Sequence, residues 1–442
     1  MGERYHFVGI GGIGMSALAK ICLEKGDRVS GSDLKKSAIT QRLQDLGANV
    51  FYCHDPKNVP EDAIAVVSSS VSKKNGEAEA AKTIWHRSDL LHHLLQQKNG
   101  IAVFGTHGKT TTSSLLAWTL DVSGGNPGFA VGGILQNFHT NGRWTEGDFF
   151  VAEGDESDGT FTAYEPNGAI VTGIGLDHMD YYGSENKLLQ AFQQVCNKPK
   201  ILVWNGDDPR LCTLNLSGIS YGESPGCSIR LLSAEQSGWS QKLTFTFEGK
   251  LFENVVLSLS GKHNASNGLA VFAMALSLGF DEEKIRNAFA SFAGVRRRCQ
   301  QRGELGGASF WDDYAHHPTE IETTLNGIRL AEPLRRLVAL FQPHRYSRTK
   351  WCLQDFSRAF RSADVVIVTD VYSAGEQVVQ GLGPKEILSQ IQMGADQPTL
   401  YLPREDLAKK LPFCLKPNDL LVTLGAGDIT CLHEEIFGDP EK

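Results

Sequence analysis

A run of glycine, lysine and threonine residues in the first half of the chain constrains the fold most strongly. Residues 105–112 read Gly-Thr-His-Gly-Lys-Thr-Thr-Thr, directly after the apolar, strand-like run Ile101–Phe104 and directly before a helix-like stretch. Glycines let a backbone approach phosphate oxygens, amides at a helix start supply partial positive charge, and Lys109 adds a full charge. Two residues separate Gly105 from Gly108, whereas the common phosphate loop has four. A glycine turn with a solvated Lys109 is the alternative, but the order of strand, loop and helix favours a nucleoside triphosphate.

A second glycine pattern lies near the N-terminus. Residues 9–14 read Gly-Ile-Gly-Gly-Ile-Gly, they follow the strand-like run Tyr5–Val8, and Asp33 follows at about the spacing of a ribose-binding acid. The pattern predicts a pyrophosphate at a helix N-terminus but does not identify the nucleoside. Taken alone it is typical of an NAD-dependent dehydrogenase, and a tight strand-to-helix turn without a ligand is the other alternative.

Strand-like and helix-like segments alternate along most of the 442 residues, which exceed the size of a single ordinary core. This alternation predicts an α/β fold with parallel strands and crossover helices. We expect three domains: a Rossmann-like domain over 1–98, a central ATPase-like α/β domain over 99–300, and a second Rossmann-like domain over 301–442. Alternating apolar residues within 228–260 predict antiparallel strands added to the central sheet.

Acidic residues and a histidine follow two strand-like runs of the central segment. Glu153 comes directly after the run 149–152 and is followed by Asp155, Glu156 and Asp158. His178 follows the run 169–173 and is flanked by Asp177 and Asp180. Because ligands gather at the carboxyl ends of parallel strands, these groups are expected near the 105–112 loop. The Thr110 hydroxyl is placed to reach a magnesium ion. Magnesium prefers oxygen ligands, so His178 could act through water or a second ion, or be a hydrogen-bonded strand-end histidine.

The overall charge and the chain's first residues exclude several classes. The net charge of −8 lacks the basic excess of a nucleic-acid surface. Nine scattered cysteines without a C-x-x-C pair indicate reduced thiols rather than a zinc ribbon or a disulfide framework. The strand-like start leaves no room for a signal peptide, and no apolar run approaches membrane-spanning length. We therefore expect a cytoplasmic protein without membrane insertion.

Taken together, eight motifs resemble the Mur ligases of peptidoglycan synthesis, and the resemblance covers essentially the whole chain. The most specific are the runs 312–320 and 342–348, and the full set is 9–15, 105–111, 152–158, 177–180, 261–267, 297–298, 312–320 and 342–348. The resemblance implies an ATP-dependent ligase that joins L-alanine to the lactyl carboxylate of UDP-N-acetylmuramate through an acyl phosphate. It also implies a requirement for Mg²⁺, and we expect a monomer or a weak homodimer.

The resemblance carries roles onto individual residues. It implies catalytic roles for Lys109, Glu153, His178, His344 and Arg345. It places the metal at Thr110, Glu153 and His178. It implies ATP binding by Gly105, Thr106, His107, Gly108, Lys109, Thr110, Thr111, Asn264, Asn267, Arg297 and Asp313. It implies binding of the sugar nucleotide and the amino acid by Gly11, Gly12, Ile13, Gly14, Asp33, Ser69, His344, Arg345 and Arg348.

Chemistry supports several of these roles and leaves alternatives beside others. An asparagine amide can both donate to and accept from a purine edge, although Asn264 could instead cap a helix. A free amino acid needs a cation for its carboxylate, which Arg345 or Arg348 can supply. The run 296–298 could otherwise be a solvated basic turn. Some Mur ligases use a carbamylated lysine, but Lys187 does not fall clearly in that register, and we predict no modified lysine.

Three other functions compete with this hypothesis. The nearest is a murein-recycling ligase that adds a preformed tripeptide to the same UDP sugar, although the run 312–320 favours the alanine enzyme. An NAD-dependent dehydrogenase would leave the Lys109 loop and the C-terminal motifs without a purpose. A sugar-nucleotide sensor with a dead ATPase site is disfavoured because Lys109, Thr110, Glu153 and His178 are all present.

Overall fold

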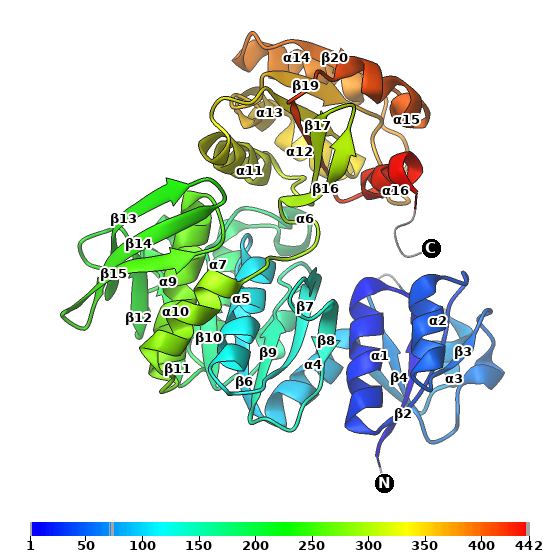
Figure 1. Cartoon of the computed structure of the whole chain (residues 1–442). Coiled ribbons are helices and arrows are strands. Elements are labelled where there is room, and N and C mark those ends of the chain that lie inside the picture. The colour runs from blue at the N-terminus through cyan, green and yellow to red at the C-terminus, as the bar shows by residue number, and fades with distance from the viewer. Residues whose placement is uncertain (1, 70, 72–74, 439–442) are drawn as a thin grey trace. The chain divides into compact units, whose positions relative to one another are not determined.

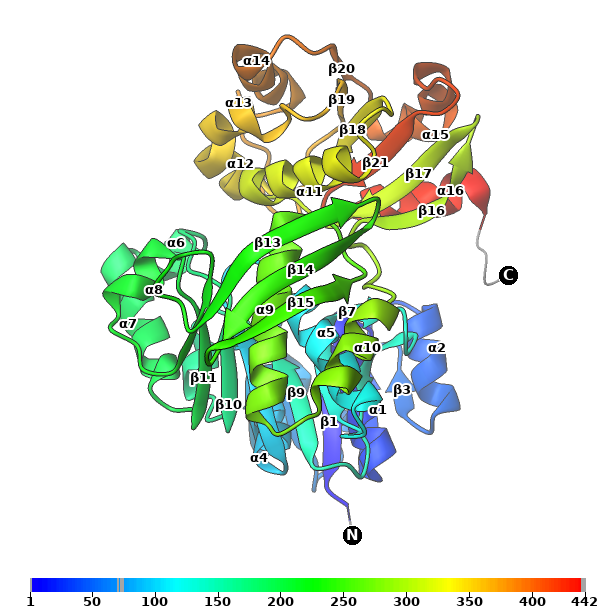
Figure 2. The same cartoon turned by 60° about the vertical axis from the view of Figure 1, so that its left-hand side comes forward.

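The computed structural model describes residues 2–69, 71 and 75–438, apart from the side chain of Asp180. The chain forms two compact units. Unit 1 comprises Met1–Ala234, Lys242–Leu257 and Ser266–Ala293, and unit 2 comprises Glu235–Gln241, Ser258–Ala265 and Gly294–Lys442. Figure 1 and Figure 2 show three sheets with their helices. The predicted α/β class with three sheets is thereby confirmed, whereas the boundaries at 98 and 300 stay predictions.

The first sheet is parallel and has the strand order β3-β2-β1-β4-β5. Its strands are β1 (Arg4–Val8), β2 (Arg28–Ser32), β3 (Asn49–Phe51), β4 (Ile64–Val67) and β5 (Thr83–His86). Its helices are α1 (Ile13–Lys25), α2 (Ala38–Asp45), the turn η1 (Pro56–Asn58), α3 (Gly76–Ala80) and α4 (Arg87–Gln96). Ser37 caps α2 by accepting from the amide of Thr40, and Gly26 ends α1 in the left-handed conformation that glycine adopts without strain.

The central sheet has ten strands in the order β15-β14-β13-β12-β11-β10-β6-β9-β7-β8. They are β6 (Asn99–Phe104), β7 (Gly128–Leu135), β8 (Thr140–Arg143), β9 (Phe149–Glu153), β10 (Gly168–Val171), β11 (Ile201–Asn205), β12 (Ile219–Gly222), β13 (Ile229–Ser237), β14 (Ser240–Phe247) and β15 (Lys250–Leu257). The strands from β12 to β9 pair in parallel, as does β7 with β9. Two-residue turns join β13 to β14 and β14 to β15, which makes these neighbours antiparallel hairpins, as the sequence predicts.

The helices that accompany the central sheet include the one that follows the phosphate-type loop. They are α5 (Lys109–Val122), the turn η2 (Thr160–Ala163), α6 (Met179–Tyr182), α7 (Glu185–Cys196), α8 (Pro209–Thr213), α9 (Lys262–Ser277) and α10 (Glu282–Ser291). Helix α10 packs on α5, and α4 packs against strands of both the first and the central sheet. The last four residues of the inner strand β6, 101–104, form a buried apolar run because both faces of the strand are covered there.

The third sheet belongs to unit 2 and has the order β16-β17-β21-β18-β19-β20. Its strands are β16 (Gln300–Leu305), β17 (Ala308–Asp313), β18 (Leu337–Phe341), β19 (Val365–Val368), β20 (Thr399–Tyr401) and β21 (Leu420–Leu424). All pairs are parallel except β16 with β17. Along β18, Leu337, Ala339 and Phe341 enter one apolar core and Val338 and Leu340 enter another. The sheet therefore buries both faces, as parallel sheets do.

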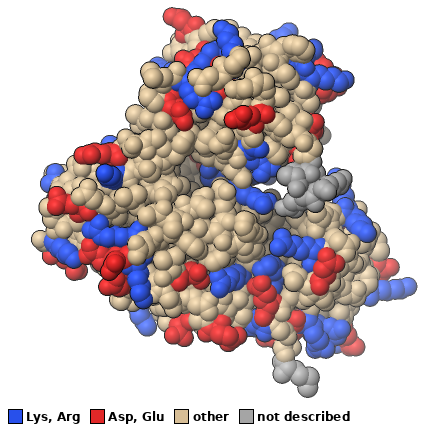
Figure 3. Space-filling view, in the orientation of Figure 1, with Lys and Arg blue, Asp and Glu red and all other residues tan. Residues whose placement is uncertain are grey.

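Helices and single turns flank the third sheet. They are α11 (Pro318–Ala331), α12 (Tyr346–Cys352), η3 (Leu353–Asp355), α13 (Phe356–Ala359), α14 (Pro384–Gly394), η4 (Arg404–Asp406), α15 (Leu407–Lys410), η5 (Leu411–Cys414), η6 (Asp428–Cys431) and α16 (Leu432–Phe437). Among the residues that the structure describes, none of the helices combines the length and apolar character that crossing a bilayer requires. Figure 3 shows basic and acidic side chains interspersed over much of one face.

Candidate active site

The loop between β6 and α5 has the backbone of a phosphate cradle. Gly105 and Gly108 have φ angles of +125° and +83°, in the region that favours glycine, and α5 begins at Lys109. A Cβ atom on Gly105 would lie 2.2 Å from the Thr172 hydroxyl, so no larger residue fits without a shift. The same hydroxyl donates to the His107 carbonyl at 2.5 Å. The loop is therefore fixed from the neighbouring strand β10, with its amides at the N-terminus of a fourteen-residue helix.

Lys109 folds back over this loop and is held there by a carboxylate. Its Nζ donates to the Gly105 carbonyl at 2.6 Å and to Glu156 Oε2 at 2.7 Å. Burial lowers the pKa of Lys109, but the carboxylates of Glu156 and Glu153 outweigh burial, so the pKa is raised and the cation is retained. A positive charge therefore lies at the loop that the sequence predicts to hold phosphates.

Thr110 and Glu153 form the pair that the sequence places at a metal. The Thr110 hydroxyl donates to Glu153 Oε2 at 2.9 Å, and the Gly132 amide donates to the same oxygen at 2.8 Å. A Cβ on Gly132 would lie 2.7 Å from that oxygen and 2.9 Å from the Thr110 hydroxyl, so glycine keeps this space open. A hydroxyl beside a carboxylate suits a hard cation such as Mg²⁺. Within the described residues there is no group of three or more His, Cys, Asp or Glu side chains arranged to hold a metal.

Glu156 is the residue that connects the two predicted functional groups Lys109 and His178. Its side chain is 3 % exposed, and His178 Nε2 lies 3.8 Å from its Oε1, whereas Lys109 contacts its Oε2. His178 Nε2 also lies 3.6 Å from Asp177 Oδ2. His178 itself has a φ of +58° at the start of α6, where the chain turns sharply. The side chain of Asp180, which flanks His178 in the sequence, lies outside the described residues.

The sequence pattern could not single out Glu156 among the four acids at and after the end of β9. Its importance comes from burial and from contacts with residues far along the chain, such as the 47-residue separation from Lys109. Tyr182 in α6 also donates its hydroxyl proton to the Glu156 carbonyl at 2.6 Å. The loop after β9 is thus tied both to the phosphate-type loop and to the histidine segment.

Of the predicted adenine-binding pair, Asn267 lies beside the loop. A Cβ on Gly108 would be 3.0 Å from its Oδ1, and the side chain is 6 % exposed. Asn264 precedes it by three residues in α9, and its Nδ2 donates to the Ser260 carbonyl at 2.8 Å. Asn264 belongs to unit 2 and Asn267 to unit 1.

The N-terminal glycine loop is held by the end of β2. The amides of Gly9 and Ile10 donate to the Ser32 carbonyl at 2.8 and 2.9 Å, and the Gly11 amide donates to Asp33 Oδ2 at 2.9 Å. A Cβ on Gly11 would lie 2.8 Å from this oxygen. Gly12 and Gly14 flank Ile13, whose side chain is 58 % exposed, at the start of α1. Asp33, predicted to bind a ribose, is therefore also the brace of the loop.

Ser69 lies at a junction between the first sheet and the acidic loop after β9. Its hydroxyl donates to Asp158 Oδ2 at 2.6 Å and lies 3.0 Å from His86 Nε2. Arg87, which follows His86 in the sequence, donates from Nη2 to Asp155 Oδ2 at 2.6 Å. His86 and Arg87 have no part in any sequence motif, although their place at the carboxyl end of a parallel strand is a signal that could have identified them.

In unit 2, Arg297 lies three residues before β16, and Asp313 is the last residue of β17. Arg297 has a φ of +59° and donates from Nη2 to the Gly425 carbonyl at 2.8 Å. Asp313 is 4 % exposed and accepts from the amides of Cys299 and Ala315, each at 2.7 Å. Burial raises the pKa of Asp313 to about 6, against the effect of nearby Arg298 and of these amides. Asp313 thus braces the chain where it enters the third sheet.

The predicted acceptor residues His344, Arg345 and Arg348 also gather in unit 2. His344 Nδ1 accepts from Arg348 Nη1 at 3.1 Å, and its ring stacks on Tyr372 with centroids 5.6 Å apart. Burial, followed by the charge of Arg348, lowers the pKa of His344 to about 4, so its ring is neutral at pH 7. Arg345 has a φ of +67° at the start of α12. The positive charge of this cluster is therefore carried by the arginines.

His316 extends this cluster. Its ring centroid lies 5.9 Å from that of His344, and its Nδ1 donates to the Tyr314 carbonyl at 3.0 Å. Burial lowers the pKa of His316 to about 4, although Glu320 acts in the opposite direction. The neutral tautomer with hydrogen on Nδ1 follows from the carbonyl partner.

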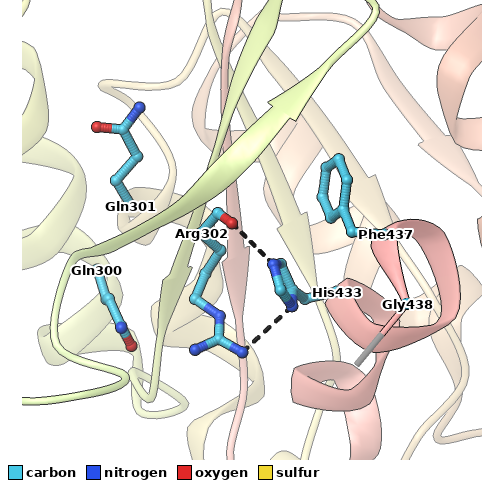
Figure 4. A pocket seen from close by; sticks show the side chains of 6 residues that line it. All are labelled: Gln300, Gln301, Arg302, His433, Phe437 and Gly438. Carbon is cyan, nitrogen blue, oxygen red and sulfur yellow. Dashed lines mark hydrogen bonds between the residues drawn. The ribbon is translucent and has the colours of Figure 1, made fainter. Parts of the chain in front are cut away.

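A separate cavity of about 280 Å³ lies in unit 2 between β16 and α16 (Figure 4). It is lined by Gln300, Gln301, Arg302, His433, Phe437 and Gly438. Arg302 Nη2 donates to His433 Nδ1 at 3.2 Å, and His433 Nε2 donates to the Arg302 carbonyl at 2.7 Å. The two polar side chains bond to each other, and none of the lining residues belongs to a sequence motif, so we assign the cavity no catalytic role.

The chain is similar to known proteins over nearly its whole length. Three family models match the chain in order: the Mur ligase family catalytic domain over residues 4–99, the Mur ligase middle domain over 103–275, and the Mur ligase glutamate ligase domain over 297–427. The UDP-N-acetylmuramate–L-alanine ligase of Protochlamydia amoebophila is 46% identical over 445 residues, which cover 98% of both chains.

Two solved structures show the same fold. The crystal structure of the UDP-N-acetylmuramate–alanine ligase MurC from Thermotoga maritima matches with a TM-score of 0.83 and 29% identity over 98% of both chains. A murein peptide ligase from Psychrobacter arcticus matches with a TM-score of 0.70 over 99% of both chains, but at 22% identity it shows the fold alone. On the strength of the family models and the full-length relative, the chain belongs to the Mur ligase family.

Proposed function

We propose that the chain is an ATP-dependent ligase that joins L-alanine to the lactyl carboxylate of UDP-N-acetylmuramate in peptidoglycan precursor synthesis. The observation that carries the proposal is the convergence of Lys109, Glu156 and the Thr110–Glu153 pair on the glycine loop before α5. The choice of substrates rests on a relative of the same length, 46% identical, that is named for this reaction.

The chemistry explains why a phosphate cradle is needed. A carboxylate is a poor acylating agent because its leaving group would be oxide. Attack of a carboxylate oxygen on the γ-phosphorus releases ADP and forms an acyl phosphate. The amine of alanine then attacks the carbonyl carbon, the tetrahedral intermediate expels inorganic phosphate, and the nitrogen loses a proton. Each step develops negative charge next to phosphate groups.

Residues of unit 1 can stabilise this negative charge. Lys109, whose cation is held by Glu156, is the group that we place at the β- and γ-phosphates. The amides of the Gly105–Gly108 loop add partial positive charge. Thr110 and Glu153 would hold Mg²⁺, which when bound neutralises phosphate charge and polarises the transferring group. His178, whose Nε2 lies 3.8 Å from Glu156 and 3.6 Å from Asp177, is our assignment for a group that would act on this ion through water.

The residues of unit 2 suit the amino-acid acceptor. Arg345 and Arg348 supply the cations that a free carboxylate requires. His344 is neutral at pH 7 because burial and Arg348 lower its pKa to about 4, so its Nδ1 can accept the hydrogen bond from Arg348 and its ring adds no charge. Asn264, Asn267 and Arg297 remain our assignments for the purine and the phosphates of ATP. We place the protein in the cytoplasm, as a monomer or a weak homodimer.

One assay tests the proposal and separates it from its rivals. Phosphate release from ATP is measured with UDP-N-acetylmuramate and, in turn, L-alanine, L-serine, glycine and the recycling tripeptide. We expect release with L-alanine above all others. Preference for the tripeptide would favour the recycling ligase, and hydride transfer without ATP consumption would overturn the proposal in favour of a dehydrogenase.

A further inference from the structure

A buried carboxylate lies beneath the N-terminal glycine loop, outside every sequence motif. Glu77 in α3 is 0% exposed, and the described groups around it are histidines, a hydroxyl and amides rather than lysine or arginine. A fully buried carboxylate is costly unless it is well hydrogen-bonded. The burial of the Glu77 carboxylate beside the first sheet therefore needs a structural or functional explanation.

Glu77 is hydrogen-bonded through both oxygens. Oε2 accepts a hydrogen bond from the Ser32 hydroxyl and lies 3.0 Å from His54 Nδ1. Oε1 accepts from Asn58 Nδ2 at 3.0 Å and from the Asp55 amide at 3.3 Å. Burial raises the pKa of Glu77, but the hydrogen bonds from Ser32, Asn58 and His54 outweigh burial and leave the pKa lowered. Glu77 is consequently an anion at neutral pH.

The partners of Glu77 on β2 are the residues that hold the glycine loop. Ser32 is the last residue of β2, and its carbonyl accepts the amides of Gly9 and Ile10. The next residue, Asp33, accepts the Gly11 amide at 2.9 Å. Fixing the Ser32 side chain therefore fixes the strand end from which three loop amides are positioned.

The other partners fix the segment after β3. His54, Asp55 and Asn58 all follow the carboxyl end of that strand, and the side chain of His54 is 28% exposed. His6 on β1 closes the cluster from the third side, with Nε2 3.7 Å from Glu77 Oε1. The carboxyl ends of β1, β2 and β3 form the edge at which a parallel sheet binds a nucleotide.

We propose that Glu77 is a positioning residue for the sugar-nucleotide site, which sets the glycine loop through Ser32 and the nucleoside edge through His54 without touching the substrate. The proposal rests on the proposed function, since it takes the first cradle to bind UDP-N-acetylmuramate. It identifies the class of ligand that Glu77 serves as a uridine diphosphate sugar rather than ATP.

The test compares the effect of one substitution on KM for UDP-N-acetylmuramate with its effect on KM for ATP. Replacing Glu77 by alanine removes the carboxylate that Ser32, His54, Asn58 and the Asp55 amide all contact, so Glu77→Ala is expected to raise KM for UDP-N-acetylmuramate about tenfold. The KM for ATP and kcat are expected to change by less than about twofold, because the second cradle is untouched. Titration calorimetry with UDP-N-acetylmuramate alone is expected to show the same loss of affinity.

Two further variants separate positioning from simple structural damage. Glu77→Gln keeps the shape and one acceptor oxygen and is expected to recover most of the affinity. Leu43→Ala removes a buried side chain of α2 in the same sheet unit, and is expected to lower the melting temperature while leaving KM for the sugar nucleotide unchanged. Ser32→Ala, which removes only one of the bonds, replaces Glu77→Ala if that variant does not fold, and is expected to raise the same KM by a few fold.

The outcomes distinguish this inference from the proposed function. If the wild-type protein releases phosphate with both substrates but Glu77→Ala and Ser32→Ala leave KM for UDP-N-acetylmuramate unchanged, the positioning role is overturned. The same holds if Leu43→Ala shifts that KM as much as Glu77→Ala does. If the wild-type protein releases no phosphate, the proposed function fails, and calorimetry with UDP-N-acetylmuramate still decides whether Glu77 sets the site.

Discussion

The two glycine loops of this chain have the same layout and opposite electrostatics. Both follow a parallel strand and open a helix, at Ile13 and at Lys109. The first, Gly-Ile-Gly-Gly-Ile-Gly, has no charged residue and is braced by the Ser32 carbonyl and Asp33. The second contains Lys109 and faces the carboxylates Glu153 and Glu156. This contrast matches the roles proposed above, in which the first loop holds a diphosphate and the second takes part in phosphoryl transfer.

The difference between the loops should be largest when the charge of the second is removed. Lys109→Ala is expected to lower kcat on the order of a thousandfold, because a fixed cation at the transferring phosphate is lost. Binding of UDP-N-acetylmuramate, measured by calorimetry, should survive because the first loop contains no part of Lys109. Exposed Lys187 is the matched control, and Lys187→Ala should leave turnover unchanged. Unchanged turnover in Lys109→Ala would refute the division of labour.

The carboxylate behind Lys109 should matter next. Glu156→Gln keeps the shape but removes the charge that holds the Lys109 cation and faces His178, so kcat is expected to fall about a hundredfold. The measurement is phosphate release at saturating substrates. Glu248→Gln, on an exposed turn between β14 and β15, is the control and should have no effect. A loss confined to KM for the sugar nucleotide would mean that Glu156 serves the other loop.

Glycine substitutions test the two loops with the same chemical change. Gly105→Ala brings a methyl group within 2.2 Å of the Thr172 hydroxyl, and Gly11→Ala brings one within 2.8 Å of Asp33 Oδ2. We expect Gly105→Ala to lower kcat/KM for ATP, and Gly11→Ala to lower kcat/KM for UDP-N-acetylmuramate, each by about tenfold or more. Gly226→Ala, with no atom within 4 Å of the added Cβ, is the control. Identical kinetic signatures for the two variants would contradict separate ligands.

The sequence patterns predict the side chains within each glycine loop, but not the residues elsewhere in the chain that hold those loops in place. The class of fold, the added hairpins and the Lys109–Thr110 pair follow from periodicity, turn residues and local spacing. Glu156 and Glu77 do not, because their meaning comes from burial and from partners tens of residues away. The predicted acceptor residues show the same limit. The sequence places His344 near Arg345 and Arg348, but the low pKa that keeps the His344 ring neutral comes from burial in the folded protein.

The smallest predicted effect lies outside both loops, in the buried histidines of unit 2. The pKa of His316 is lowered to about 4 in the folded protein, below the ordinary value of 6.5, so the unfolded chain binds a proton first as pH falls. His316 therefore favours folding fully above pH 6.5, and this contribution is lost between pH 6.5 and about 4. Asp313, with its pKa raised to about 6, acts in the opposite direction and is more favourable in acid.

Urea unfolding at pH 7 and pH 5 measures this balance. His316→Gln should flatten the fall in unfolding free energy between the two pH values by at most about 2 kcal/mol. Asp313→Asn should steepen it, since it removes the group that opposes the histidines. Because His316 and Asp313 belong to unit 2, binding of UDP-N-acetylmuramate by unit 1 at pH 7 should be the same in both variants and in the wild type. If either variant weakened that binding, the first loop would depend on residues of unit 2 as well as on the strand ends that hold it. The contrast between the two glycine loops would then not be explained by their own surroundings alone.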